Sequence, residues 1–214
     1  MNLTKTPFTN AAIGNDPEIL RDIHLQPVNI AIYEREILPT QTELDHILEQ
    51  SIECRASGSI AEVTATLRTY FAETIPEQQA LLDDILEVLQ LFEKSTEISS
   101  FRLLLATVST NMCRRFHTDI NDLRLLCTYA GPGTLWLPNE AVNQKAYQGG
   151  RSNMDIVANE GLIQQAQTGD VVILKGALYP DANPVLHRSP SIEQTQGKRL
   201  LLRIDNNESH NLWS

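Results

Sequence analysis

The spacing of the apolar residues changes near residue 100, and this change restricts the chain to a mixed α+β fold. Before it, apolar residues recur three and four positions apart in residues 42–56, 60–71 and 76–92, which predicts three helices. After it come short segments rich in strand-forming residues, separated by Gly, Pro and Asn. We therefore expect a helical layer on a sheet that belongs to a barrel or a double-sheet jelly roll. The predicted strands are 28–33, 101–110, 123–129, 134–137, 170–174 and 198–204.

The length of 214 residues is enough for one domain with an extension. Residues 1–26 are polar and are interrupted by prolines, so we predict an N-terminal arm with at most one short helical turn. Residues 27–214 are predicted to be a single domain, in which 27–98 form a strand and the helical layer and 99–214 form the β core. The polar stretch 138–153 is long enough to be a lid or a disordered insertion.

Composition excludes several classes of partner. The chain has 27 acidic and 17 basic residues and a net charge of -10, which argues against nucleic acid as a partner. The three cysteines contain no Cys-x-x-Cys pair, so a disulfide framework or a zinc ribbon is not expected, and a reducing cytoplasm fits best. No apolar run approaches the ~18 residues that span a bilayer, and the N-terminus has no signal-peptide pattern. The sequence thus predicts a cytoplasmic protein without a membrane partner, and it leaves the oligomeric state open.

A His-x-Asp pair lies between two of the predicted strands. On an extended segment His117 and Asp119 share a face, where they offer an imidazole nitrogen and a carboxylate oxygen. These are two of the three ligands of a 2-His-1-carboxylate triad, the arrangement that non-haem Fe(II) uses for O₂ chemistry. His187 is the candidate for the third ligand.

The order of these motifs carries a resemblance to a known group of enzymes. After His-x-Asp, Gly169 and Asp170 open an apolar strand, and His187 precedes a final strand with Arg199 and Arg203. This order resembles the Fe(II)/2-oxoglutarate-dependent oxygenases, in particular their prolyl-hydroxylase-like branch. The resemblance implies an α+β protein with a double-stranded β-helix, or jelly-roll, core and an N-terminal helical layer.

Longer motifs are similar to a bacterial family known as domain of unknown function 1826. Members of that family carry Arg-Phe-His-x-Asp, Leu-Arg-Leu-x-x-Thr-Tyr-x-Gly-Pro-Gly-Thr-x-Trp-Leu, Leu-Lys-Gly and His-Arg-Ser-Pro. All four motifs occur here, at residues 115–119, 123–137, 174–176 and 187–190. The family resemblance does not bring an activity with it, so the expected chemistry comes from the oxygenases.

The oxygenase resemblance assigns a role to each candidate residue. It implies that His117, Asp119 and His187 are the metal ligands and form the catalytic centre. Arg199 stands where such oxygenases place the basic residue that pairs with the distal carboxylate of 2-oxoglutarate, and Arg203 could substitute for it. A guanidinium suits this role because it can donate two parallel hydrogen bonds to one carboxylate.

Three residues of the strand after His-x-Asp are further candidates for contact with 2-oxoglutarate. They are Arg124, Thr128 and Tyr129. Strand alternation places Arg124 and Thr128 on one face and Tyr129 on the other, so the three side chains cannot all reach the same ligand.

The resemblance therefore implies a hydroxylase-type oxygenase that uses Fe(II) and 2-oxoglutarate on an unidentified substrate, a small molecule or a protein side chain. Two alternatives remain open. A cupin-like site could bind zinc or another divalent ion in metal homeostasis, because nitrogen and oxygen ligands do not by themselves select iron. The scaffold could also be a non-catalytic binding module with a vestigial triad. The sequence has no Gly-x-Ser-x-Gly, phosphate-binding loop or His-Glu-x-x-His motif, which sets aside hydrolase, nucleotidase and dehydrogenase functions.

Overall fold

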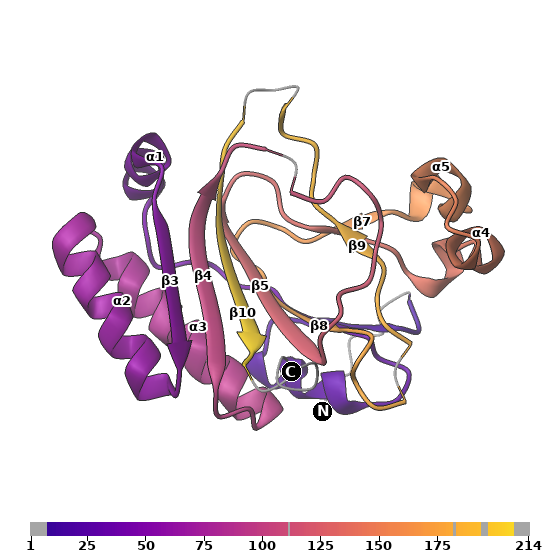
Figure 1. Cartoon of the computed structure of the whole chain (residues 1–214), viewed down its shortest axis with the longest axis horizontal. Coiled ribbons are helices and arrows are strands. Elements are labelled where there is room, and N and C mark those ends of the chain that lie inside the picture. Colours follow the sequence, from indigo (N-terminus) through magenta and orange to yellow (C-terminus); the bar gives the residue numbers. More distant parts are fainter. Residues whose placement is uncertain (1–7, 111, 182, 194–196, 208–214) are drawn as a thin grey trace.

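The computed structural model describes residues 8–110, 112–181, 183–193 and 197–207. Its centre is a seven-stranded sheet with helices on one face and a three-stranded sheet on the other side, which is a mixed α+β fold (Figure 1). Neighbouring strands are antiparallel except for the first pair, which is parallel. The strand order is β1 (Ala11–Gly14), β2 (Ile30–Tyr33), β8 (Val171–Lys175), β5 (Leu123–Ala130), β10 (Arg199–Asn206), β4 (Phe101–Val108) and β3 (Glu53–Gly58).

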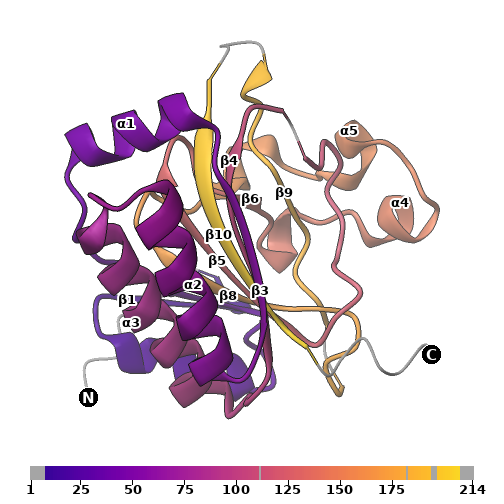
Figure 2. The ribbon, with the colours of Figure 1, turned by 60° about the vertical axis from the view of Figure 1, so that its left-hand side comes forward.

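Three helices cover one face of the large sheet, and Figure 2 shows α2 and α3 running alongside the strands. Thr40 and Ser59 begin the first two helices with capping boxes. In each, the hydroxyl accepts the backbone N–H of a glutamate three residues later, and the side chain of that glutamate accepts the backbone N–H of the capping residue. These caps and the apolar stripes explain why the predicted helices form. None of the helices in the described ranges is long and apolar enough to cross a lipid bilayer. The helices are α1 (Gln41–Gln50), α2 (Ile60–Thr74) and α3 (Gln79–Thr96).

The smaller sheet consists of very short strands with small helices in the connection between two of them. This connection includes residues 138–153, which pack into an apolar cluster with Phe116 and Leu186. The stretch is therefore a folded part of the protein rather than a disordered insertion. The strands are β7 (Gln164–Gln165), β6 (Leu135–Trp136) and β9 (His187–Arg188), and the helices are η2 (Asn139–Ala141), α4 (Gln144–Gln148), α5 (Asn153–Ile156) and η3 (Glu160–Leu162).

Side-chain alternation divides the large sheet between two cores. Along β5, Leu125, Cys127 and Tyr129 join the core under the helices. Leu126 and its β10 neighbour Leu201 join a second core, to which the smaller sheet contributes Trp136. Because residues two apart share a face, the polar residues interspersed with Leu126 and Leu201 also point away from the helices.

Two predictions for the N-terminal half need correction. Residues 8–26 of the predicted arm pack on the domain: β1 pairs with β2, and η1 (Pro17–His24) buries Leu20 and Ile23. The four residues of β1 are too few and too small to give a periodic signal. Residues 53–56, predicted as the end of the first helix, belong to β3 (Glu53–Gly58), because Ser51 adopts a left-handed conformation that ends α1. Residues 1–7 of the arm lie outside the described residues, and the division of residues 27–214 stays a prediction.

Candidate metal centre

The two histidines of the predicted triad lie opposite each other on neighbouring extended segments. His117 donates its backbone N–H to the carbonyl of His187 at 3.1 Å, and His187 donates to the carbonyl of His117 at 3.0 Å. β9 also pairs with β6, so His187 is anchored on its other side by Trp136. The ring centroids of the two histidines are consequently only 4.7 Å apart. The fold thus brings together two residues that are distant in the sequence.

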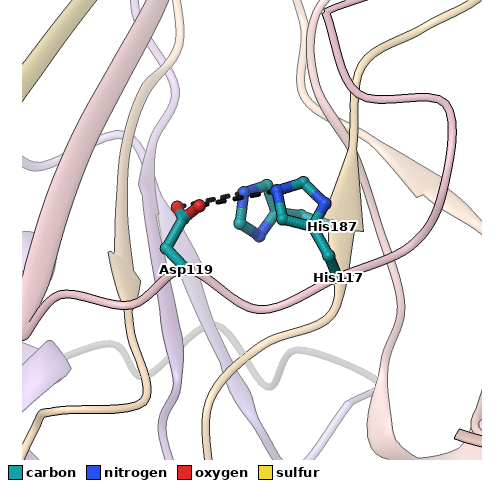
Figure 3. Close-up of side chains that lie close together, drawn as sticks. All are labelled: His117, Asp119 and His187. Atoms are coloured by element: carbon teal, nitrogen blue, oxygen red, sulfur yellow. Dashed lines mark ion pairs between the residues drawn. The ribbon is translucent and has the colours of Figure 1, made fainter. Parts of the chain in front are cut away.

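Asp119 completes a cluster of three converging side chains (Figure 3). Its Oδ1 lies 3.5 Å from Nε2 of His117, and its Oδ2 lies 3.2 Å from Nε2 of His187. One ligand atom from each of the three residues lies within 4.8 Å of the other two. Two imidazole nitrogens and one carboxylate oxygen at this separation are suited to a single divalent ion.

The other ring nitrogen of each histidine faces a backbone carbonyl. Nδ1 of His117 lies 3.0 Å from the carbonyl oxygen of Arg115, and Nδ1 of His187 lies 3.4 Å from that of Val185. A proton on Nδ1 can be donated to the carbonyl, which leaves the lone pair of Nε2 directed toward the centre. Such a carbonyl partner fixes the tautomer and the orientation of metal-binding histidines.

The electrostatic surroundings keep Asp119 ionised. Burial favours its neutral form, but the neighbouring rings of His117 and His187 and the charge of Arg124 outweigh burial and hold the pKa of Asp119 well below its usual range. The hydrogen bond to Asp119 in turn raises the pKa of His117. Nη1 of Arg124 is 2.6 Å from Oδ2, yet this oxygen accepts no hydrogen bond of regular geometry. A charged oxygen in this state can act as a ligand to a cation.

Arg124 is itself held by a second carboxylate. Its Nε lies 2.5 Å from Oδ1 of Asp205, which also accepts a hydrogen bond from Asn121 at 3.1 Å. Oδ2 of Asp205 lies 3.2 Å from Nε of Arg203. The Nη1 and Nε atoms of Arg124 are thus paired with Asp119 and Asp205, and its contact with a co-substrate stays a prediction.

Arg199 is buried without a carboxylate partner. The residue is only 2% exposed, its Nη2 donates to the hydroxyl of Thr128 at 3.0 Å, and its Nε has no hydrogen-bond partner. No carboxylate among the described residues forms an ion pair with it. Burial lowers the pKa of Arg199 to about 10. A buried, unpaired guanidinium is costly, so this position favours the binding of an anion.

Arg199 and the two histidines line the same pocket, which has a volume of about 70 Å³. His117 has 32% of its side chain exposed, compared with 6% for His187, so the metal centre opens to solvent on the His117 side. Cys113 and Thr134 also line this pocket, and all three cysteines are free thiols.

The family model described as "Protein of unknown function (DUF1826)" matches residues 14–205. The chain belongs to this family. No curated protein matches it.

Two solved structures illustrate what this DUF1826 chain is similar to. The crystal structure of the dioxygenase for auxin oxidation in rice is 14% identical over 92% of this chain and 82% of that one, with a TM-score of 0.49. A prolyl-4-hydroxylase from Pseudomonas putida is 9% identical over 88% of this chain and 96% of that one, with a TM-score of 0.43. These values are too low to transfer the activity of either protein.

The structure of the DUF1826 chain shows which candidates for contact with 2-oxoglutarate lie on the face of the sheet that carries the metal centre. Arg199 and Arg203 line the pocket beside the histidines, and Thr128 accepts a hydrogen bond from Arg199. Tyr129 does not belong there, because its side chain lies under the helices and donates a hydrogen bond to Asp84 at 2.8 Å. Its assignment to the cofactor site is therefore corrected: alternation separates Tyr129 from Arg124 and Thr128, and the structure shows that the face of Tyr129 is the one under the helices. The roles of the remaining residues stay predictions.

Sequence reasoning missed two residues that shape the centre. Asp205 is 1% exposed and contacts both Arg124 and Arg203, while Arg102 lies 3.9 Å from Asp205 across the neighbouring strand. Alternation from Arg203 to Asp205 along the last strand was a usable signal. The contact with Arg102 depends on strand register, which the sequence does not specify.

Proposed function

We propose that this protein is a non-haem Fe(II)/2-oxoglutarate-dependent oxygenase of the hydroxylase type, with its two sheets forming a double-stranded β-helix core. The observation that carries the proposal is the pairing of two features in one pocket. One is the set of converging donors on His117, Asp119 and His187, and the other is the unpaired guanidinium of Arg199. The first suits a divalent metal, and the second suits the carboxylate of a co-substrate.

The three donor residues fit Fe(II) in the proposed role. Both Nε2 atoms are directed at an ionised carboxylate whose Oδ2 lacks a regular hydrogen bond, so a cation can take up all three donors. His117, Asp119 and His187 would hold the ion. When bound with 2-oxoglutarate, Fe(II) supplies O₂ activation and oxidative decarboxylation, which together hydroxylate a C–H bond of the substrate.

The chain's own residues bind and orient the reactants. Arg199 binds the distal carboxylate of 2-oxoglutarate, and Thr128 orients the guanidinium through its hydroxyl. Arg124 holds Asp119 in place through their ion pair. Leu126 and Leu201 line the same pocket and exclude water from the side of the large sheet.

Arg199 separates this proposal from the two alternatives. A zinc site for metal handling needs the three donors but has no use for a buried guanidinium that lacks a carboxylate. A vestigial binding module needs neither feature. The oxygenase accounts for both, because it must bind a dicarboxylate next to its metal.

The test is anaerobic addition of Fe(II) and 2-oxoglutarate to the purified protein, followed by visible absorption spectroscopy. We expect a metal-to-ligand charge-transfer band that the His117→Ala variant lacks. His46→Ala is the matched control, because His46 lies on the exposed side of α1, away from the donors, and should leave the band unchanged.

Absence of the band in the wild type at saturating Fe(II) and 2-oxoglutarate would reject the mechanism. Stoichiometric zinc without 2-oxoglutarate binding would then support metal handling. Failure to retain any metal, together with normal stability, would support the binding module.

A further inference from the structure

A second cavity lies next to the metal centre and is rich in arginine. It has a volume of about 380 Å³, and four of its nine lining residues are arginines: Arg55, Arg102, Arg124 and Arg203. Asp205 is the only carboxylate among the lining residues. This concentration of positive charge is notable in a chain whose net charge is -10. We call this cavity the arginine cleft.

The arginine cleft is built by two adjacent rows across the sheet. In one row Arg102 of β4 pairs with Asp205 of β10, which pairs with Arg124 of β5. In the next row Arg55 of β3 and Arg203 of β10 flank Leu104 of β4. Because these positions alternate with the residues under the helices, all four guanidinium groups lie on the same face of the sheet.

The carboxylates in and beside the arginine cleft leave part of its positive charge uncompensated. Arg124, Arg203 and Arg102 share Asp205 at 2.5, 3.2 and 3.9 Å, and of these three only Arg124 has a second carboxylate in ion-pair contact among the described residues, Asp119 at 2.6 Å. Arg55 pairs with Glu53, but both side chains are more than half exposed, and such pairs are weak. The side chains of Arg102 and Arg203 are 36% and 30% exposed, so an anion from solvent can reach them.

The arginine cleft shares two lining residues with the pocket of the metal centre. Arg124 and Arg203 line both cavities, whereas Arg199 lines only the pocket of the metal centre, and Arg55 and Arg102 line only the arginine cleft. Arg124 and Arg203 thus lie between two candidate anion-binding positions, one at Arg199 and one at Arg55 and Arg102. The cleft's volume is in the range of small-molecule sites.

We propose that the arginine cleft binds the carboxylate or phosphate group of a small anionic substrate and thereby presents another part of that substrate to the metal centre. This inference rests on the proposed oxygenase function for the role of the bound molecule. Guanidinium groups on adjacent strands can donate several charge-assisted hydrogen bonds to one such anion. The co-substrate keeps its own position at Arg199.

The test is isothermal titration calorimetry with inorganic phosphate in one arm and malonate in the other, with and without saturating 2-oxoglutarate. The tighter-binding anion identifies the preferred group. We expect Arg102→Gln to raise the Kd of that anion by about tenfold, the factor that follows from losing one charge-assisted hydrogen bond, and Arg55→Gln to add to this loss. Saturating 2-oxoglutarate should leave the Kd of the wild type unchanged.

Two variants control for net charge and for folding. Arg68→Gln removes one charge from the exposed surface of α2 and should bind the anion as the wild type does. Arg102→Lys keeps the charge and should restore part of the affinity. Thermal unfolding of each variant verifies that the fold is intact.

Three results would overturn the proposal: no anion binding by the wild type, unchanged binding by Arg102→Gln, or displacement of the anion by 2-oxoglutarate. The last result would mean that the anion binds at Arg199. The outcome is independent of the spectroscopic test of the oxygenase. Arginine-dependent anion binding without a charge-transfer band would reject the oxygenase and retain the anion site. A charge-transfer band without arginine-dependent anion binding would retain the oxygenase and reject the anion site.

Discussion

Two buried arginines on opposite faces of the large sheet differ in how their charge is compensated. Under the helices, both Nη groups of Arg35 bond to Asp84 at 2.8 and 2.6 Å. Asp84 also accepts hydrogen bonds from the Tyr129 hydroxyl at 2.8 Å and the Leu38 amide at 3.0 Å. On the other face, Arg199 donates a hydrogen bond to the hydroxyl of Thr128 and has no carboxylate partner within the described part of the chain.

The pKa values of the two arginines reflect this difference. Burial acts to lower the pKa of both, but the hydrogen bonds with Asp84 raise that of Arg35 above its usual value. The pKa of Arg199 falls to about 10 because nothing offsets its burial. The comparison teaches that the charge of Arg35 under the helices is matched by a carboxylate, whereas the charge of Arg199 beside the metal centre has no carboxylate partner among the described residues.

The largest expected effect on stability comes from breaking the ion pair between Arg35 and Asp84 under the helices. Asp84→Asn leaves the charge of Arg35 buried and unpaired, which should lower the free energy of unfolding by about 3–5 kcal/mol. Urea denaturation followed by circular dichroism measures this change. A loss below about 1 kcal/mol would mean that the ion pair does not stabilise the helix-covered face.

Removing one hydrogen bond from the same network should have a smaller effect. Tyr129→Phe deletes the hydroxyl that donates to Asp84 and should lower the free energy of unfolding by about 1–2 kcal/mol. The charge-transfer band with Fe(II) and 2-oxoglutarate should remain, because Tyr129 lies on the helix side of the sheet. Loss of the band in a folded Tyr129→Phe protein would contradict the conclusion that the helix-covered face of the sheet serves stability and not the metal centre.

Asp170 is a third buried ionisable residue to compare with Arg35 and Arg199. No arginine in the described ranges forms an ion pair with its carboxylate. Burial raises the pKa of Asp170 from its usual 3.8 to about 6. The folded state therefore holds this proton more tightly than the unfolded state does, and stability falls as the pH rises from about 4 to about 6. Asp170→Asn should lack this fall, so its stability relative to the wild type should rise between pH 4 and pH 7. Denaturation curves at pH 4, 5, 6 and 7 test this, and parallel pH profiles would contradict it.

The smallest change in stability is expected for Arg199→Met. This variant replaces an unpaired buried charge with an apolar side chain, so the free energy of unfolding should change by less than about 1 kcal/mol or increase. Binding of 2-oxoglutarate should nevertheless weaken by at least about tenfold, because the carboxylate loses its guanidinium partner. Titration of the charge-transfer band and urea denaturation measure the two effects. A strongly destabilised variant would place Arg199 among the structural arginines.

Elements with strong local patterns could be predicted from the sequence. The helices have capping residues and apolar stripes, and the long strands β4, β5 and β10 have runs of strand formers. β1, β7 and β9 were missed because two to four residues are stabilised by pairing with their neighbours and not by their own preferences.

The residues of the candidate site likewise divide into those with a local sequence signal and those whose position depends on strand pairing. The spacing of His117 and Asp119 is local, and His187 could be added from the order of the motifs. Alternation separated Tyr129 from Arg124 and Thr128, and it could have placed Asp205 on the face of Arg203. Arg102 could not be linked to the centre, because its contact with Asp205 arises from the register of β10 against β4.

The pair of backbone hydrogen bonds between His117 and His187 has a consequence for the order of assembly. These bonds join the two segments through backbone atoms alone, so the long intervening loop is closed by contacts that do not involve the metal-binding side-chain atoms. The chelating atoms are preorganised, in contrast to small domains whose chains fold only around their ion. Chelators should therefore strip such an ion without unfolding the protein, and the amides of both residues should stay protected from hydrogen exchange.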